Sequence, residues 1–391
     1  MSLFIDNARL VSGAGGPIVP DARVRINGDK IVALGTKIVP EVGDRIIDAD
    51  GRVLLPGFVD AHTHALWAGD RLAEFELKLA GKSYLEILAG GGGIHATVRA
   101  VRAASEAELA ELLLRRLNVM LREGATTIEV KSGYGLSTEH ELKMLRAIRA
   151  AAERFSGTIV ATALLGHAKD PEQPDFVERV VSETLPAVHA EFPGLAIDAF
   201  CEEGAFSVAE CRRLFEAARA LGHPLRLHTD QFNALGGLEL ALELGARSVD
   251  HLEVTPPEAL QRLGRSGTFA VMLPAGGFHL DGRYASGRAL LDAGGKLVLA
   301  SNCNPGSSPT SSLPFVLALA MRKLGLKLDE ALRAITSSAA ELLGLDDRGS
   351  VAVGKRADLV LLRHRDERLL GYEVGGNPVD TVICGGRLVS G

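Results

Sequence analysis

Short apolar runs alternate with amphipathic stretches over most of this chain, and this alternation constrains its fold more than any other feature. Eight runs between Gly57 and Ser301 have the length and composition of buried strands, and helix-like stretches separate them. The predicted strands are 57–62, 126–131, 158–165, 195–201, 224–228, 246–251, 268–273 and 296–301. Eight strand–helix units match a (β/α)8 barrel, whereas the alternative, a doubly wound open sheet, usually has fewer strands. We therefore predict an α/β fold with a TIM-type barrel.

Two of the predicted helices carry a recognisable start signal. Ser105 with Glu108, and Ser207 with Glu210, have the spacing of capping boxes. In a capping box the serine and the glutamate each satisfy a backbone N–H that the first helical turn leaves without a partner. Helices are therefore expected to begin directly after Ser105 and Ser207.

Both ends of the chain consist of strand-like runs without helices. Asn27-Gly28 lies between two alternating runs and favours a tight turn, since both residues tolerate positive φ. The predicted strands are 3–5, 23–26, 30–34 and 45–47 near the start, and 350–353, 357–362, 381–383 and 387–389 near the end. Neither group is large enough to be stable alone, so we expect them to pair as one β-sandwich. The predicted domains are 1–55 and 348–391, which form the sandwich, and 56–347, the barrel.

Charge and composition narrow the class of partner. The 391 residues have a formal net charge of −6 and a pI near 6.0, so the chain lacks the basic surface that nucleic acid or an anionic membrane requires. A small molecule is the expected partner. No apolar run reaches transmembrane length, no signal-peptide pattern opens the chain, and the four cysteines have no paired spacing. We expect a cytoplasmic protein.

Polar side chains collect where the predicted strands end, and in a (β/α)8 barrel these ends surround the active site. His62 and His64 are alternate residues at the end of the first strand, so their imidazoles share a face and can bind one divalent cation. The other strand-end groups are Lys131 to Tyr134, His167, Cys201 to Glu203, His228, His251 and Asn302. Five of the 11 histidines lie at strand ends. This concentration predicts a metal or acid–base site.

The strand-end pattern resembles the amidohydrolase superfamily. His-x-His after the first strand, with single histidines after the fifth and sixth, is similar to the pattern of that superfamily, as is the segment 354–360 that returns to the sandwich. More closely, the chain resembles the imidazolonepropionase family of histidine degradation. The segments that carry this resemblance are 69–71, 75–77, 81–84, 90–94, 129–135, 228–231 and 304–308.

The resemblance implies a reaction and a metal. Members of the family hydrolyse the ring of 4-imidazolone-5-propanoate to N-formimidoyl-L-glutamate, with Zn or Fe as the divalent or trivalent ion. By this resemblance His62, His64 and His228 are metal ligands, and Asn302 stands at the remaining ligand position. Many relatives bridge two metals with a lysine on the fourth strand, but Lys131 is on the second strand, so one metal per chain is expected. The resemblance also suggests a homodimer.

The same resemblance assigns residues to an acidic substrate. Arg71 is expected to bind the substrate carboxylate with its guanidinium fork, assisted by the hydroxyls of Tyr134 and Tyr84. His167 is expected to bind the ring, and His251, next to Asp250, to stabilise charge or relay a proton. The predicted product-binding loop after the eighth strand contains Asn304, Gly306 and Ser307.

Two positions depart from the superfamily. Asn302 replaces an aspartate that ligates the metal and accepts a proton, and Gln231 replaces a glutamate base of related deaminases. Both are expected at the catalytic centre, and Gln231 is also expected to contact substrate. An amide is a weaker ligand than a carboxylate and accepts no proton at useful pH. Asn302 is an engineered replacement, a natural change compensated by His251 or Asp230 as base, or a sign of lost activity. We expect a weakened site with depressed turnover.

Two alternative functions remain open from the sequence. The first is hydrolysis of another small acidic cyclic amide. The second is binding without efficient turnover on the same scaffold, because a fold alone does not establish catalysis.

Overall fold

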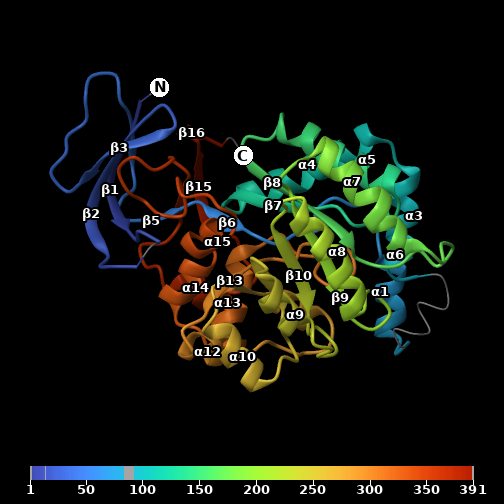
Figure 1. Cartoon of the computed structure of the whole chain (residues 1–391). Coiled ribbons are helices and arrows are strands. Elements are labelled where there is room, and N and C mark those ends of the chain that lie inside the picture. The colour runs from blue at the N-terminus through green and yellow to red at the C-terminus, as the bar shows by residue number, and fades with distance from the viewer. Residues whose placement is uncertain (1, 14, 83–91, 390–391) are drawn as a thin grey trace.

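The computed structural model describes residues 2–13, 15–82 and 92–389, which form two sheets with helices around one of them (Figure 1). Residues 83–84, which include Tyr84, and residues 90–91 of the resemblance segments lie outside the described residues. Within these ranges, the helices are either too short or too polar to cross a membrane.

The central sheet is a parallel barrel whose strands pair in chain order, which confirms all eight predicted strands. The strands are β6 Phe58–Asp60, β7 Ala125–Lys131, β8 Thr158–Gly166, β9 Ala196–Cys201, β10 Leu225–Thr229, β11 Ser248–His251, β12 Phe269–Met272 and β13 Lys296–Leu299. Backbone hydrogen bonds just beyond the strands connect β13 to β6. The N–H of Asn302 donates to the carbonyl of His62 over 3.0 Å, and the N–H of His64 donates to the carbonyl of Cys303 over 3.0 Å.

The helices surround the barrel. They are α1 Leu72–Leu79, α3 Ile94–Ala103, α4 Glu106–Arg122, α5 Thr138–Ala152, α6 Phe176–Arg179, the π-helix η1 Val180–Thr184, α7 Leu185–Glu191, α8 Val208–Ala220, α9 Gly237–Leu244, α10 Pro257–Gly264, α11 Pro274–His279, α12 Gly287–Asp292, α13 Leu313–Lys323, α14 Leu328–Ala334, α15 Ser337–Leu342 and α16 Leu369–Tyr372. Both predicted capping boxes are confirmed, at the start of α4 and of α8.

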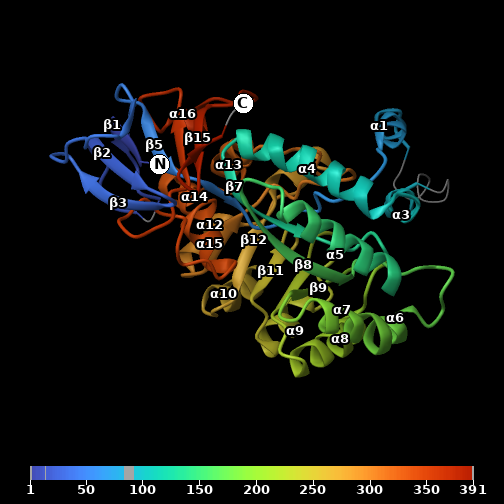
Figure 2. The same cartoon turned by 90° about the horizontal axis from the view of Figure 1, so that it is seen from above.

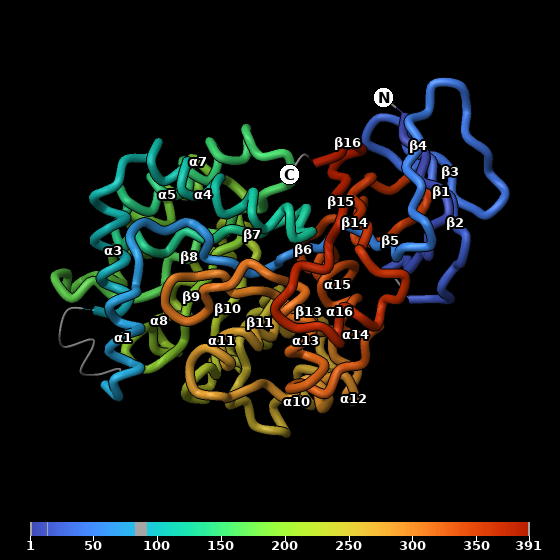
Figure 3. Tube along the Cα trace, turned by 180° about the vertical axis from the view of Figure 1, so that it is seen from behind, coloured from blue at the N-terminus to red at the C-terminus, as the bar shows by residue number. Residues whose placement is uncertain are grey.

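The second sheet combines strands from both chain ends. Its strands are β1 Ser2–Leu10, β2 Val19–Asn27, β3 Lys30–Gly35, β4 Arg45–Asp48, β5 Val53–Pro56, β14 Leu359–Leu362, β15 Val379–Cys384 and β16 Arg387–Leu388. β14 pairs antiparallel with β5, so the two ends lie side by side, as Figure 3 shows in blue and red. They hydrogen-bond as one mixed sheet. The register of β1 shifts twice, where bulges bend the sheet.

Two local predictions at the chain ends are wrong. Residues 350–353 do not form a strand. The N–H of Val351 bonds to the carbonyl of Ser12, and the N–H of the adjacent Gly354 bonds to the carbonyl of Ile31. These two bonds connect the segment to two different places near the N-terminus instead of to one neighbouring strand. The turn between β2 and β3 is formed by Gly28 and Asp29, one residue later than expected.

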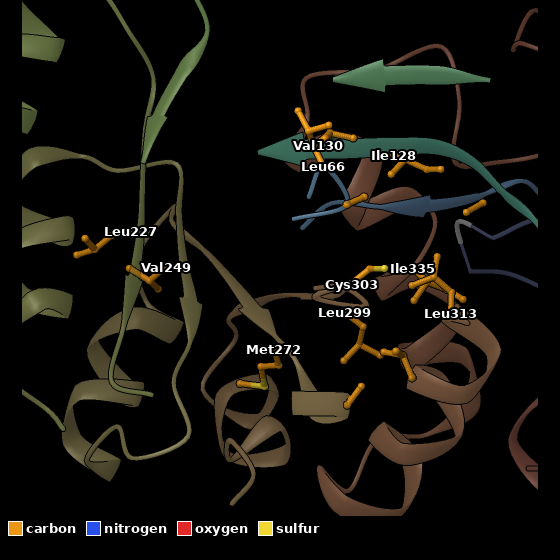
Figure 4. Close-up of a cluster of buried hydrophobic side chains, with 14 of the residues drawn as sticks. Leu66, Ile128, Val130, Leu227, Val249, Met272, Leu299, Cys303, Leu313 and Ile335 are labelled. Carbon is orange, nitrogen blue, oxygen red and sulfur yellow. The ribbon is translucent and has the colours of Figure 1, made fainter. Parts of the chain in front are cut away.

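Each sheet has its own apolar core. The core of the chain-end sheet includes Leu3, Val24 and Leu359. The larger core fills the space between barrel and helices, and Figure 4 shows part of it, including Val130, Leu227 and Leu299. Viewed from above, the chain-end sheet and α1 lie at opposite ends of the molecule (Figure 2). The buried framework therefore holds the strand ends in fixed positions.

Candidate active site

Three histidines meet at the carboxyl end of the barrel. His62 and His64 follow β6, and His228 lies on β10. The Nε2 atom of His64 is 3.3 Å from Nε2 of His62 and 3.4 Å from Nε2 of His228, and all three side chains are buried. Three imidazole nitrogens directed at a common point form a donor set for a metal ion.

The protein fixes the orientation of two of these rings through their other nitrogen. Nδ1 of His62 is 2.6 Å from the carboxylate of Asp250, and Nδ1 of His228 is 3.0 Å from that of Asp198. A carboxylate at Nδ1 keeps the proton there and leaves Nε2 with its lone pair. Burial lowers the pKa of His62, His64 and His228 well below the ordinary value, so the rings are neutral and able to bind a cation.

The two carboxylates belong to a charged network inside the barrel. Lys131 Nζ is 2.7 Å from Glu129 and 2.9 Å from Asp198, while Arg226 is 2.8 Å from Asp250. All five side chains are buried. Three carboxylates and two cations leave one net negative charge, which a cation among the histidines would balance. Lys131 and Arg226 already neutralise Asp198 and Asp250, so this pair is not free to hold a second ion.

Asn302 adds a buried amide oxygen that accepts no hydrogen bond from the described residues. Its side chain is buried, and Oδ1 has no hydrogen-bond partner among the described residues. A buried polar atom without a partner is costly in a protein interior, and in a metalloprotein such atoms commonly face the ion. Because the N–H of Asn302 bonds to the carbonyl of His62, Asn302 lies beside the first histidine. The donor set of three imidazoles and one amide oxygen fits a metal ion.

Backbone strain is concentrated at the same strand ends. Asp230, His251, Leu252 and Asn302 all have positive φ, between 53° and 90°. Such conformations cost about 1–3 kcal/mol each in residues other than glycine and persist where the surrounding structure holds them. They cluster directly after β10, β11 and β13, which is typical of a functional site.

The carboxylate that faces His251 is Glu253, not Asp250. Nδ1 of His251 is 3.3 Å from Glu253 Oε1, whereas Asp250 contacts His62. The expected pairing of His251 with Asp250 is therefore corrected. Positive φ at His251 and at Leu252 reverses the chain, which brings Glu253 back onto the histidine. No sequence signal singled out Glu253, since the pairing depends on this turn.

Two further predicted residues lie against the histidines. The ring of His167 stacks on that of His64 with ring centroids 5.0 Å apart. The centroid of the Tyr134 ring lies 5.1 Å from that of His167. Burial lowers the pKa of His167 to about 4, so the ring is neutral at pH 7. Burial raises the pKa of Tyr134, and the nearby Arg71 cation opposes this shift. Tyr134 thus lies between the histidine cluster and Arg71.

Arg71 caps the start of α1 and is mostly buried. Its Nη2 donates to Glu74, and its Nη1 is 3.5 Å from the Thr97 hydroxyl. Its Nε is buried and has no partner within the described chain. Nη1 also lies 3.4 Å from the point a Cβ on Gly306 would occupy. The guanidinium therefore lies beside the loop after β13, and one of its donors, Nε, has no partner among the described residues.

The loop after β13 is held by Asn304. The amide of Asn304 donates to the carbonyl of Asn302 over 2.6 Å, and its oxygen accepts from the N–H groups of Gly306 and Ser307 over 2.9 and 2.7 Å. The side chain thus shapes the loop that joins Asn302 to the Arg71 region. A direct contact of Asn304, Gly306 or Ser307 with substrate stays a prediction, as does one of Gln231, which is buried after β10.

Glu141 is a buried carboxylate that sequence reasoning missed. It lies in the first turn of α5 and accepts from the N–H groups of Gly133, Gly135 and Leu136 at 2.7–2.9 Å. These bonds fix the loop that carries Tyr134. A glutamate near a helix start is too common to identify such a role from sequence.

The barrel and its histidine cluster define a metal-dependent hydrolase of the amidohydrolase type. The model of the amidohydrolase family matches residues 77–390 of the chain. Among solved structures, a triazine hydrolase variant superposes with a TM-score of 0.78 at 20% identity, over 99% of this chain and 94% of that one. An N-isopropylammelide isopropylaminohydrolase from Burkholderia multivorans gives a TM-score of 0.73 at 20% identity, over 99% and 98%. These two likenesses support the fold.

Sequence comparison narrows the class further. The chain is 46% identical to imidazolonepropionase from Herpetosiphon aurantiacus, covering 99% of this chain and 96% of that protein. It is also 46% identical to imidazolonepropionase from Symbiobacterium thermophilum, with the same coverage. The chain belongs to the imidazolonepropionase family and is a hydrolase of a cyclic C–N bond.

Proposed function

We propose that this chain hydrolyses 4-imidazolone-5-propanoate to N-formimidoyl-L-glutamate in histidine catabolism. Its similarity to imidazolonepropionases over almost its whole length is the observation that carries the proposal. The site agrees with this proposal. It contains a histidine cluster that could hold a metal ion and a guanidinium, that of Arg71, suited to a carboxylate. Tyr134 and the loop of Asn304 connect the two.

One Zn or Fe ion per chain would be held by His62, His64 and His228, with the Asn302 oxygen beside them. When bound, such an ion lowers the pKa of water and polarises a carbonyl group. Asp250 and Asp198 keep His62 and His228 in the ligating tautomer. The neutral imidazoles suit either metal, so this donor set does not decide between Zn and Fe, and the choice depends on which metal is available.

The other residues bind substrate and move a proton. Arg71 binds the propanoate with the help of the Tyr134 hydroxyl, while His167 contacts the ring. Water adds its oxygen to the ring carbonyl carbon, the bond from that carbon to the ring nitrogen breaks, and the nitrogen takes up a proton. His251 carries this proton, because Glu253 holds its Nδ1 and leaves Nε2 free.

The family resemblance also supports a cytoplasmic homodimer. The chain's formal net charge of −6 agrees with a small-molecule partner rather than with nucleic acid or an anionic membrane. Measurement of mass in solution tests the dimer.

The direct test is ring opening by the purified chain, with metal content measured on the same sample. We expect loss of imidazolone and formation of N-formimidoyl-L-glutamate, detected by mass spectrometry, with Zn or Fe present. Turnover of a different acidic cyclic amide in place of the imidazolone would replace the proposed substrate. Tight binding of imidazolonepropionate by the metal-loaded protein without any turnover would favour the binding-only alternative. The reason would be that the neutral Asn302 accepts no proton.

A further inference from the structure

One face of α1 carries three charged residues at helical spacing. Arg71, Glu74 and Lys78 are separated by three and four positions, so their side chains share the same side of the helix. None of the residues of α1 is fully buried, yet these three are less exposed than their neighbours on the helix. A half-buried charged row on a helix needs a partner, because desolvated charges are costly when unpaired.

The loop after β13 covers this row. Lys78 Nζ is 3.5 Å from the carbonyl oxygen of Gly306, and Arg71 Nη1 faces the same glycine. Gly306 is also the residue whose N–H is held by Asn304, so its position is fixed relative to Asn302. The two cations thus approach one backbone segment that leads directly to the histidine cluster.

The charges of the row do not balance. The carboxylate of Glu74 is used by Arg71 and by the N–H of Gly93, which lies 3.0 Å from Oε1. Within the described chain, Lys78 has no carboxylate at ion-pair distance, and its one hydrogen bond is to a neutral carbonyl. Two cations and one carboxylate leave a net charge of +1. Burial and the neighbouring Arg71 cation lower the pKa of Lys78, and the Glu74 carboxylate opposes this shift.

We propose that Lys78 is a specificity-determining residue, a second cation that binds the substrate carboxylate together with Arg71. Glu74 acts as a positioning residue, since it holds Nη2 of the Arg71 guanidinium while Nε has no partner among the described residues. A bound carboxylate brings the net charge of the row to zero. Arg71 supplies a directional donor from its planar guanidinium, and Lys78 adds a point charge beside the same loop. The inference rests on the proposed function, because it concerns the carboxylate of that substrate.

The test uses a probe that does not depend on turnover. Imidazole-4-propanoate has the ring and the acidic tail but no ring carbonyl to hydrolyse, and its primary amide is a neutral counterpart of the same shape. Calorimetry on the metal-loaded chain compares the affinities of both compounds for wild type, Lys78→Met, Lys78→Arg and Lys37→Met. Lys37 is exposed in the loop between β3 and β4 of the chain-end sheet, so its replacement removes the same charge far from the site.

We expect Lys78→Met to weaken binding of the acid about tenfold, the loss of one charge-assisted contact, and to leave binding of the amide unchanged. Lys78→Arg should retain the preference for the acid, and Lys37→Met should match wild type. In ring opening, KM should rise in Lys78→Met while kcat is kept. Arg71→Ala should raise KM in the same way.

The outcomes separate this inference from the proposed function. If wild type opens the ring but Lys78→Met binds the acid as tightly as wild type, the second cation is wrong. Equal losses for acid and amide would also overturn it, because they would show a structural role. If wild type does not open the ring while Lys78→Met still loses the acid selectively, the proposed function fails and the carboxylate site stands.

Discussion

Asn302 is the single residue with the largest expected effect on this site. Its backbone is fixed next to His62, and its Oδ1 is buried without a partner, so the position suits a ligand while the side chain is a weak one. The described neighbours provide a cluster of neutral histidines, and an amide adds no negative charge to it. A carboxylate in the same place would strengthen attraction for the ion and accept a proton.

We expect Asn302→Asp to raise both metal occupancy and the ring-opening rate, the latter by about 10²-fold or more if general-base catalysis returns. Metal analysis and initial rates on the same samples measure the two effects. Asn118→Asp is the matched control, because this asparagine is exposed on α4. Equal occupancy and rate in Asn302→Asp and wild type would mean that the base lies elsewhere, with His251 and Glu253 the first place to look.

At this scale the sequence predicted which histidines meet, but not what holds them. His62, His64 and His228 were predicted because strand ends converge in a barrel. Asp250 and Asp198, the partners of His62 and His228, and Glu253, the partner of His251, were missed or misassigned. Adjacency in sequence linked Asp250 to His251, yet neighbouring residues of a strand point to opposite faces, so Asp250 turns to His62. The return of Glu253 depends on two strained residues that no sequence pattern indicates.

At the scale of elements, the loop after β7 depends on α5. Glu141 accepts three backbone N–H groups from the segment that carries Tyr134. We expect Glu141→Ala to lower the melting temperature, because each buried N–H left without an acceptor costs about 1–3 kcal/mol. It should also raise KM, since Tyr134 loses its fixed position. Calorimetric melting and steady-state kinetics measure both.

The control for this prediction is Glu111→Ala on α4. Glu111 pairs with Arg154 on the surface, and exposed ion pairs contribute little to stability. A change in Glu141→Ala no larger than in this control would show that the loop is held by other contacts.

Regular elements were more predictable than irregular ones. The eight barrel strands and the two capping boxes follow from local composition and spacing, which act over a few residues. The segment 350–353 has the same alternating composition as a strand, but the N–H of Val351 bonds to the carbonyl of Ser12, beyond the end of β1, and the N–H of the adjacent Gly354 bonds to Ile31 on β3. Such long-range competition for hydrogen bonds is invisible to a local pattern.

At the scale of the whole molecule, the chain-end sheet and the histidine cluster are connected by very little chain. β5 ends at Pro56, β6 begins at Phe58, and His62 and His64 follow within a few residues. β5 is held between β1 and β14, so strands from both ends of the sequence support the segment that delivers these histidines. We propose 1–55 with 348–391 as one structural unit and 56–347 as the other, and the site depends on both.

A metal held by His62, His64 and His228 links segments far apart in the sequence, so its binding should stabilise the folded chain. A ligand that binds only the native state at 100 times its dissociation constant adds about 2.7 kcal/mol. We therefore expect chelation to lower the melting temperature by several degrees and added Zn or Fe to restore it.

His62→Ala and His228→Ala should be folded, melt near the chelated wild type and show no response to metal, because the apolar core is separate from the ligands. His189→Ala is the matched control, since His189 pairs with His223 away from the cluster, and it should keep the full response. A metal-dependent shift that persists in His62→Ala would remove His62 from the ligand set, and a shift lost in His189→Ala would place the stabilising ion elsewhere.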